Sequence, residues 1–220
     1  EGGEHAVAYC DAQAAFLRLE RQNETRGGAR GYVLLEHRVE YSSPFSPDLL
    51  LAKNYIPILC LMHARDCLKQ TGFFDESLPA NEDWDLFIRL AQRYPFVHIP
   101  EVTAEYTQVV NDQGSVSGNR LNAFYSVAAI YGKYARLAAQ SRARNLMAIR
   151  QRNLQELEQS TFAQDRWERL EEIGAVYERH GHLQEAERVY AQWAERSPGQ
   201  ESRQALTRIR LQQKPLKTPP

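Results

Sequence analysis

The sequence predicts an α/β domain, a partly formed mixed sheet with flanking helices, followed by an all-α region. In residues 1–118, short apolar runs typical of strands alternate with helical patterns. Residues 119–160 contain no proline and a single glycine, and apolar residues recur at mostly three- and four-residue spacing, which predicts one or two long connecting helices. A helical hairpin with a capping helix is expected over 161–213, and the Pro/Lys-rich stretch 214–220 predicts a disordered tail.

The composition fits an ordinary globular protein and excludes several classes. The 220 residues carry a net charge of −1, with 43% apolar and 25% charged residues. This balance disfavours a nucleic-acid partner. The arginines at 142, 144, 150 and 152 therefore read as a solvated helix surface. No apolar run approaches the roughly twenty residues that span a bilayer. Three cysteines, at 10, 60 and 67, show no metal-type spacing, which predicts reduced thiols and a cytoplasmic location.

Local patterns predict the first elements of the α/β domain. Residues 5–9 (HAVAY) predict a strand, with Asp11 just beyond its end. The polar, glycine-containing stretch 20–31 predicts a surface loop, and 32–41 predicts a second strand. An acid directly after a strand is placed where open α/β sheets bind ligands.

The next stretch predicts short elements separated by prolines. Pro47 opens a short helix that runs through residue 51. The apolar run 58–62 predicts a buried strand. A short helix is expected over 64–70, and Gly72 suits its C-terminal cap.

One amphipathic helix is expected after Asn81, a suitable N-cap. Trp84, Phe87, Ile88 and Ala91 recur at i, i+3, i+4 and i+7 and form an apolar stripe. An acid–base pair at 85 and 89 is expected on the polar side. Two short strands, 96–99 and 102–106, are expected to follow, with a break at the proline between them.

This region resembles the second half of the family 2 glycosyltransferases. The resemblance rests on the ordered motifs GFFDE (72–76), EDWDL (82–86), RL (89–90) and HIP (98–100). It implies a GT-A fold and transfer of a sugar from a nucleotide-sugar donor to an acceptor. By the same resemblance Asp83 is the general base and Glu82 its substrate-side neighbour. A carboxylate can take a proton from a sugar hydroxyl. The alternative is that both acids only stabilise the helix N-terminus.

Asp11 is the candidate metal ligand. In the resembled family a DxD-type motif at this place holds Mn²⁺ or Mg²⁺ against the donor diphosphate, and such ions prefer carboxylate oxygens. Here Gln13 stands where the second acid would be, so the match is partial. The alternative is that Asp11 only forms a turn.

Three further residues are candidate substrate contacts. Residues 49–76 resemble the acceptor-side segment of the family, so His63 and Arg65, which follow a predicted strand, could face a ligand. A structural role is the alternative for His63. Trp84 could stack on a sugar, although its place in the apolar stripe favours core packing. The expected loop at 107–119 lacks the histidine that often begins the family's donor-covering loop.

Residues 166–198 resemble one tetratricopeptide (TPR) repeat. The pattern consists of Leu170, Ile173, Gly174, Tyr177, Gly181, Ala186, Tyr190 and Pro198. Gly174 and Ala186 are small where two antiparallel helices would press close. A single repeat cannot bury its apolar face, so the preceding helix and 201–212 are expected to cover it.

Together these features predict a glycosyltransferase whose acceptor is a glycan or a lipid-linked sugar. The donor-binding half expected from the resemblance is absent from the sequence, and the first residue is Glu. We therefore expect a piece of a longer enzyme, inactive by itself, or a sheet edge covered by a protein partner or another copy. The alternative is a non-catalytic interaction module that uses the TPR-like helices.

Overall fold

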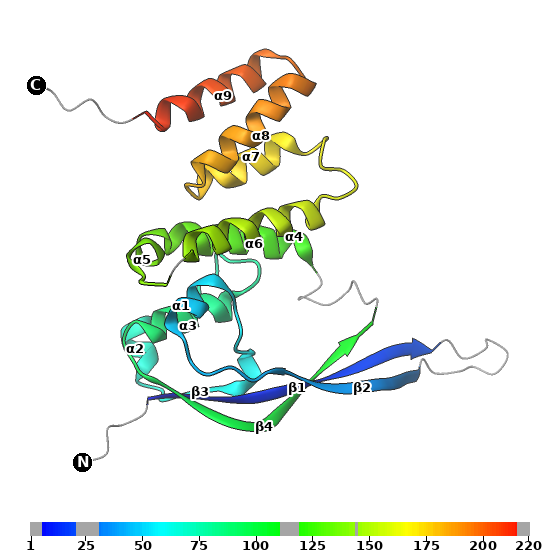
Figure 1. Ribbon diagram of the computed structural model, residues 1–220, viewed down its shortest axis with the longest axis vertical. Coiled ribbons are helices and arrows are strands. Elements are labelled where there is room, and N and C mark those ends of the chain that lie inside the picture. Colours follow the sequence, from blue (N-terminus) through cyan, green and yellow to red (C-terminus); the bar gives the residue numbers. More distant parts are fainter. Residues whose placement is uncertain (1–5, 21–30, 111–118, 144, 215–220) are drawn as a thin grey trace, which may run out of the picture. The chain divides into compact units, whose positions relative to one another are not determined.

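The computed structural model describes residues 6–20, 31–110, 119–143 and 145–214. The chain divides into two compact units, each described by itself. Unit 1 comprises Glu1–Ser77 and Asn81–Asn119, and unit 2 comprises Leu78–Ala80 and Arg120–Pro220. Strands are found in the described part of unit 1, and that of unit 2 is helical (Figure 1).

Unit 1 is built on a four-stranded mixed sheet with the long strand β1 at its centre. The strands are β1 (Val7–Glu20), β2 (Gly31–Tyr41), β3 (Leu61–His63) and β4 (Phe96–Val109). Along one edge β1 pairs in parallel with β4, and along the other it pairs antiparallel first with β3 and then with β2. Every pairing in the sheet therefore runs through β1.

Two strand predictions need correction. β1 does not end at residue 9, so Asp11 and Gln13 lie within the strand. β4 is one strand and is not divided at Pro100. The neighbouring β1 residues Cys10 and Asp11 pair with Ile99 and Val102 of β4. Pro100 and Glu101 are therefore left out of the ladder. Proline has no N–H to donate, so a local irregularity lets the strand continue past it.

The helices of unit 1 follow the predicted order, but one strand predicted between them is wrong. They are α1 (Pro47–Ala52), α2 (Cys67–Thr71) and α3 (Glu82–Ala91). The predicted buried strand at 58–62 is wrong: a 3-10 turn, η2 (Ile58–Cys60), precedes the three-residue β3. Ile58, Leu59 and Met62 are exposed. An apolar run alone does not distinguish a buried strand from an exposed turn.

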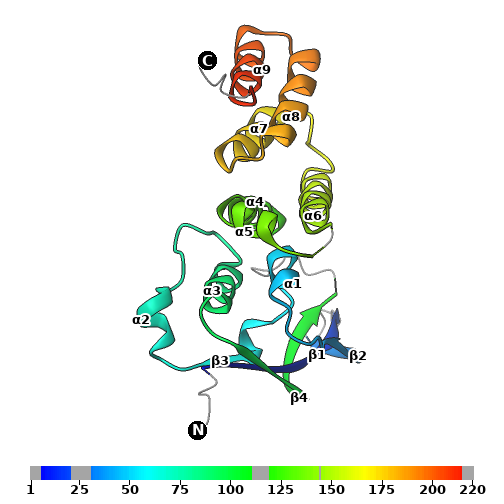
Figure 2. The ribbon, with the colours of Figure 1, turned by 60° about the vertical axis from the view of Figure 1, so that its left-hand side comes forward.

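Helices α1 and α3 contact each other on one side of the sheet (Figure 2). The predicted apolar stripe is confirmed, because Trp84, Phe87 and Ile88 are buried. The Trp84 indole Nε1 donates to the carbonyl of Leu50 over 2.6 Å. Burying an aromatic side chain of this kind stabilises the packing by roughly 1.5–3 kcal/mol.

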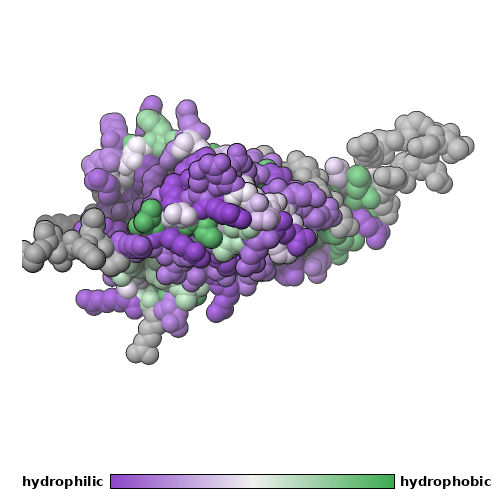
Figure 3. All heavy atoms as spheres, turned by 90° about the horizontal axis from the view of Figure 1, so that it is seen from above, coloured by the Kyte–Doolittle hydropathy of each residue, from purple (hydrophilic) through white to green (hydrophobic). Residues whose placement is uncertain are grey.

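The described residues of the stretch 119–160, where one or two long helices were expected, form three helices. They are α4 (Arg120–Lys133), α5 (Ala135–Gln140) and α6 (Leu146–Thr161). Three more follow: α7 (Leu170–Arg179), α8 (Leu183–Arg196) and α9 (Gln200–Gln212). No helix within the described ranges is long and apolar enough to cross a bilayer. Hydrophilic residues dominate the face seen in Figure 3.

The close packing expected between α7 and α8 is confirmed. A Cβ added to Gly174 would lie 2.4 Å from the Tyr190 ring, so only glycine fits at this contact. Gly181, at the turn between the helices, has a φ of 77°, which favours glycine. The structure therefore shows a tight helical hairpin here.

The arginines of 142–152 do not form one exposed surface. Arg142 and Arg152 are exposed, Arg144 lies outside the described residues, and Arg150 is 3% exposed. The Arg150 guanidinium donates to the carbonyls of Tyr131 (2.6 Å) and Tyr134 (3.2 Å) at the end of α4, where the helix dipole favours a cation. Burial lowers the pKa of Arg150 to about 10.

Candidate functional site

Asp83 lies in the first turn of α3 and is half-buried. Its Oδ1 accepts a hydrogen bond from the backbone N–H of Trp84 over 2.7 Å. Its Oδ2 accepts one from the Asn54 amide over 3.3 Å. Asn54 follows α1, so two elements far apart in the sequence hold the carboxylate. Glu82, in contrast, is exposed.

The surroundings of Asp83 make it a better proton acceptor than an ordinary aspartate. Burial is the main reason why the pKa of Asp83 is raised, and the neighbouring Glu82 charge raises it further. The hydrogen bonds from Trp84 and Asn54 act in the opposite direction. A raised pKa means that the carboxylate holds a proton more strongly, which suits a general base.

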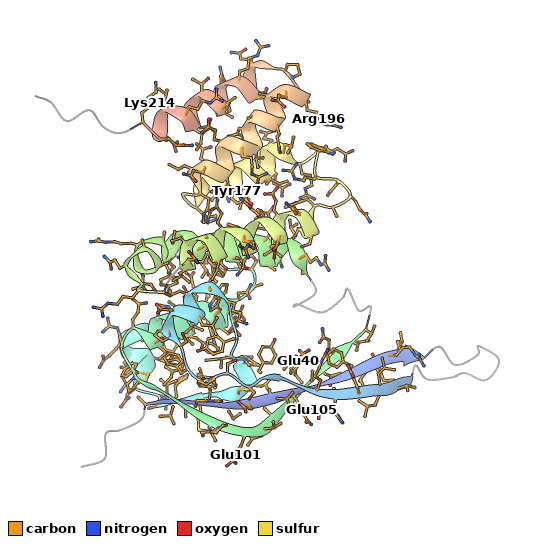
Figure 4. All side chains as sticks on the ribbon, viewed as in Figure 1. Glu40, Glu101, Glu105, Tyr177, Arg196 and Lys214 are labelled. Atoms are coloured by element: carbon orange, nitrogen blue, oxygen red, sulfur yellow. The ribbon has the colours of Figure 1, made fainter. Side chains whose placement is uncertain are left out.

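Two tyrosines that the sequence analysis did not single out belong to this region. The pKa of Tyr41 is raised mainly by burial, and the charges of Glu40 and Asp83 add to this, so Tyr41 lies within the electrostatic field of Asp83. Its ring meets that of Tyr106 edge-on at 5.6 Å. The Tyr106 hydroxyl donates to the Glu40 carboxylate, and Figure 4 shows Glu40 beside the strands. Both tyrosines lie at the last residue of a predicted strand, and this position could have identified them as candidate site residues.

Asp11 is engaged by two protein groups. His98 Nε2 lies 2.6 Å from Oδ1, and the Ser42 hydroxyl donates to Oδ2 over 2.8 Å. The His98 ring also stacks on Tyr9 with centroids 4.8 Å apart. Asp11 is 5% exposed. It therefore joins β1 to β4 and to the residue after β2.

The donor set at Asp11 does not fit a divalent ion as it stands. Both carboxylate oxygens already accept hydrogen bonds. The Gln13 amide, in the position of the missing acid, donates to Glu105 over 2.7 Å. No group of three His, Cys, Asp or Glu side chains in the described part of the chain could hold a metal. The Mn²⁺ or Mg²⁺ ion stays a prediction without support from these contacts.

The end of β2 connects the surroundings of the two carboxylates. Ser42 contacts Asp11, and its neighbour Tyr41 lies in the field of Asp83. The two predicted acids thus have neighbours at the end of β2.

The other predicted contacts lie elsewhere in unit 1. His63 pairs with Val7 near the start of β1, and its Nδ1 lies 3.0 Å from the carbonyl of Ala64. Arg65 is exposed. Neither makes a hydrogen bond or ion pair with Asp11 or Asp83 among the described residues. Trp84 is 3% exposed, so it packs in the core. Its ring has no open face on which a sugar could stack.

The motif at 72–76 is tied to α3 by one arginine. Arg89 donates to the carbonyls of Thr71 (2.5 Å) and Phe73 (2.7 Å) and to the Asp85 carboxylate (2.8 Å). Asp85 was expected on the polar side of α3, but it is 0% exposed. The Asp85–Arg89 pair on α3 therefore anchors the loop that contains the 72–76 motif, and this contact links the two motifs.

The comparison with known families decides the assignment. Residues 34–160 match the family described as glycosyltransferase like family 2, and they make up more than half of the chain. The chain belongs to this family. No curated protein and no solved structure matches it.

The range matched by the glycosyltransferase family has a clear relation to the site. It contains Tyr41, Asn54, Asp83 and Tyr106, while Asp11 lies before it. Helices α7–α9 lie beyond the match. The TPR assignment of the hairpin therefore stays a prediction.

Proposed function

We propose that this chain supplies the acceptor side of an enzyme that transfers a sugar from a nucleotide-sugar donor to a hydroxyl group of a glycan or lipid-linked acceptor. One observation carries the proposal: Asp83, within the family match, is half-buried at a helix start and has a raised pKa. A solvent-exposed acid at a helix N-terminus would be expected to have a lowered pKa, because the helix dipole favours its charge, so burial distinguishes Asp83 from such an acid.

In the proposed reaction Asp83 removes the proton from the acceptor hydroxyl. The acceptor oxygen forms a bond to the anomeric carbon of the donor, and the bond to the nucleotide diphosphate breaks. In this proposal Asn54 orients the Oδ2 atom of the base, to which its amide donates a hydrogen bond. A single base without a covalent nucleophile suits inversion at the anomeric carbon.

The proposal gives Asp11 a supporting role. With His98 and Ser42 it holds β1 to β4 and to the residue after β2. An ion at the donor diphosphate would supply charge neutralisation of the leaving group. No step of the proposed reaction depends on that ion.

We expect the reaction to fail in mild acid. Because burial raises the pKa of Asp83, the base becomes protonated above the usual aspartate range. The value of kcat/KM for transfer should then fall with decreasing pH, with a midpoint above that range. Initial rates measured across pH, with the fold followed by circular dichroism, test this. A midpoint at or below the usual aspartate range would contradict the role of Asp83.

A second candidate function is a non-catalytic interaction module. A groove of about 930 Å³ along α9 favours it. Arg203, Thr207 and Leu211 are among its lining residues, and Leu211 is largely exposed. A protein partner would bind this surface without any sugar chemistry.

Calorimetric titration with UDP- and GDP-sugars, with and without MnCl₂, separates the two candidates. For the chain joined to a donor-binding half, we expect saturable heat from one of the donors if the chain is part of the transferase. The same titration should give no heat if the chain serves only as an interaction module. Transfer to a mixture of glycan and lipid-linked acceptors, followed by mass spectrometry, then identifies the acceptor class.

A further inference from the structure

Two cysteine side chains meet beside the candidate site. Cys10 lies on β1, and Cys60 ends η2 directly before β3. The antiparallel register pairs Tyr9 with Leu61, and Cys60 lies one residue before Leu61, in the turn η2 that contacts β1. Cys10 Sγ lies 3.7 Å from the carbonyl oxygen of Cys60. Both cysteines are free.

This placement suits a disulfide bond. Facing residues of an antiparallel pair have Cα atoms about 4.5–5.5 Å apart, inside the roughly 4.4–6.8 Å range of disulfides. The third cysteine, Cys67, is buried and its Sγ lies 3.7 Å from the carbonyl oxygen of Ala6. Cys10 and Cys60 are therefore the pair that can join without a large backbone movement.

We propose that Cys10 and Cys60 form a reversible disulfide when the protein is oxidised by a peroxide. In the first step a thiolate sulfur attacks the peroxide, an S–O bond forms, the O–O bond breaks, and water or an alcohol leaves. In the second step the Cys60 sulfur attacks the Cys10 sulfenic acid, the S–S bond forms, the S–O bond breaks, and the hydroxyl group leaves as water with the proton of the Cys60 thiol. The two thiols are oxidised by two electrons in total, and the peroxide is reduced.

The surroundings of the thiols set the order of these steps. Cys10 is half-buried, whereas Cys60 is buried. The more accessible Cys10 is therefore the sulfur that the peroxide meets first.

The bond would form next to groups of the site. Cys10 precedes Asp11 on β1. A disulfide would tie β1 to the turn that follows Asn54, the residue that contacts Asp83. This inference goes beyond the proposed function and does not depend on it, because it is read from the covalent mass of the chain.

The test uses the reduced, folded 220-residue chain treated with hydrogen peroxide. After remaining thiols are blocked with iodoacetamide, intact mass and peptide mapping locate the bond. We expect the oxidised chain to lose two hydrogen atoms, to contain a Cys10–Cys60 peptide pair, and to return to the starting mass with dithiothreitol. Cys67→Ser should behave like the wild type, whereas Cys10→Ser and Cys60→Ser should lose the bond. In Cys60→Ser, dimedone should label Cys10.

Two outcomes would overturn the proposal. One is a wild-type chain in which Cys10 is oxidised to the sulfinic acid while Cys60 remains a free thiol. The other is a bond between Cys10 and Cys67. Both are read in the wild-type chain, whose fold is checked by circular dichroism before oxidation, so a poorly folded variant cannot decide the result.

Discussion

Replacing Asp83 with asparagine is expected to lower kcat for sugar transfer by about 10²–10⁴-fold, the contribution typical of a general base. The amide cannot take the proton from the acceptor hydroxyl. Its oxygen can still accept the hydrogen bond from the Trp84 N–H, so the start of α3 should keep its geometry. Steady-state kinetics with both substrates varied should show the loss in kcat, with the donor KM little changed.

The same variant should be at least as stable as the wild type at neutral pH. A carboxyl whose pKa is raised in the folded state binds more protons there than in the unfolded state, so its ionisation destabilises the fold as pH rises through that window. Asparagine does not ionise and avoids this cost. Urea unfolding of both proteins at pH 7 measures the difference in free energy.

Glu82→Gln is the matched control for Asp83→Asn. It removes an exposed carboxylate from the same helical turn and leaves the base in place. We expect its kcat to stay within about tenfold of the wild type, since it makes no direct proton transfer. If Asp83→Asn transferred sugar as fast as this control, the assignment of the base would be wrong.

Replacing Glu158 with glutamine is expected to lower the unfolding free energy of unit 2 by about 2–4 kcal/mol. Glu158 is 1% exposed and accepts hydrogen bonds from Arg166 (3.0 Å), Arg188 (2.6 Å) and Tyr177 (2.6 Å). Figure 4 shows Tyr177 within the helices of unit 2. Without the carboxylate, two guanidinium groups remain close together with no shared counter-charge. Solvent reaches Arg188, which keeps the expected loss below that of a fully buried pair.

Glu187→Gln provides the comparison for this effect. Glu187 pairs with Arg210 between α8 and α9, and the Arg210 side chain is 56% exposed. An exposed pair of this kind contributes about 0–1 kcal/mol. Denaturant unfolding followed by far-UV circular dichroism should separate the two variants clearly. Equal losses from both would show that Glu158 does not organise the helical unit.

The amphipathic pattern of α3 was sufficient to predict its start, its buried stripe and the position of Asp83 in its first turn. The hairpin of α7 and α8 was also predictable, because Gly174 and Tyr190 occur at spacings that bring small and large residues together. Asp85 was misplaced, since a charged residue at a polar helix position gives no sign that a distant loop will cover it. The length of β1 was underestimated because an acid and an amide interrupt its apolar residues.

By itself, the sequence determined the features that depend on neighbours along the chain: the helix starts, the tight helical hairpin and the motif that carries the proposed base. Only the tertiary structure decided which distant groups meet. It joined Asp11 to His98, 87 residues away, and brought Tyr41 into the field of Asp83 and Cys10 against Cys60. The physical reason is strand register: a shift of one residue turns a side chain to the other face of the sheet, and register depends on the packing of the whole unit.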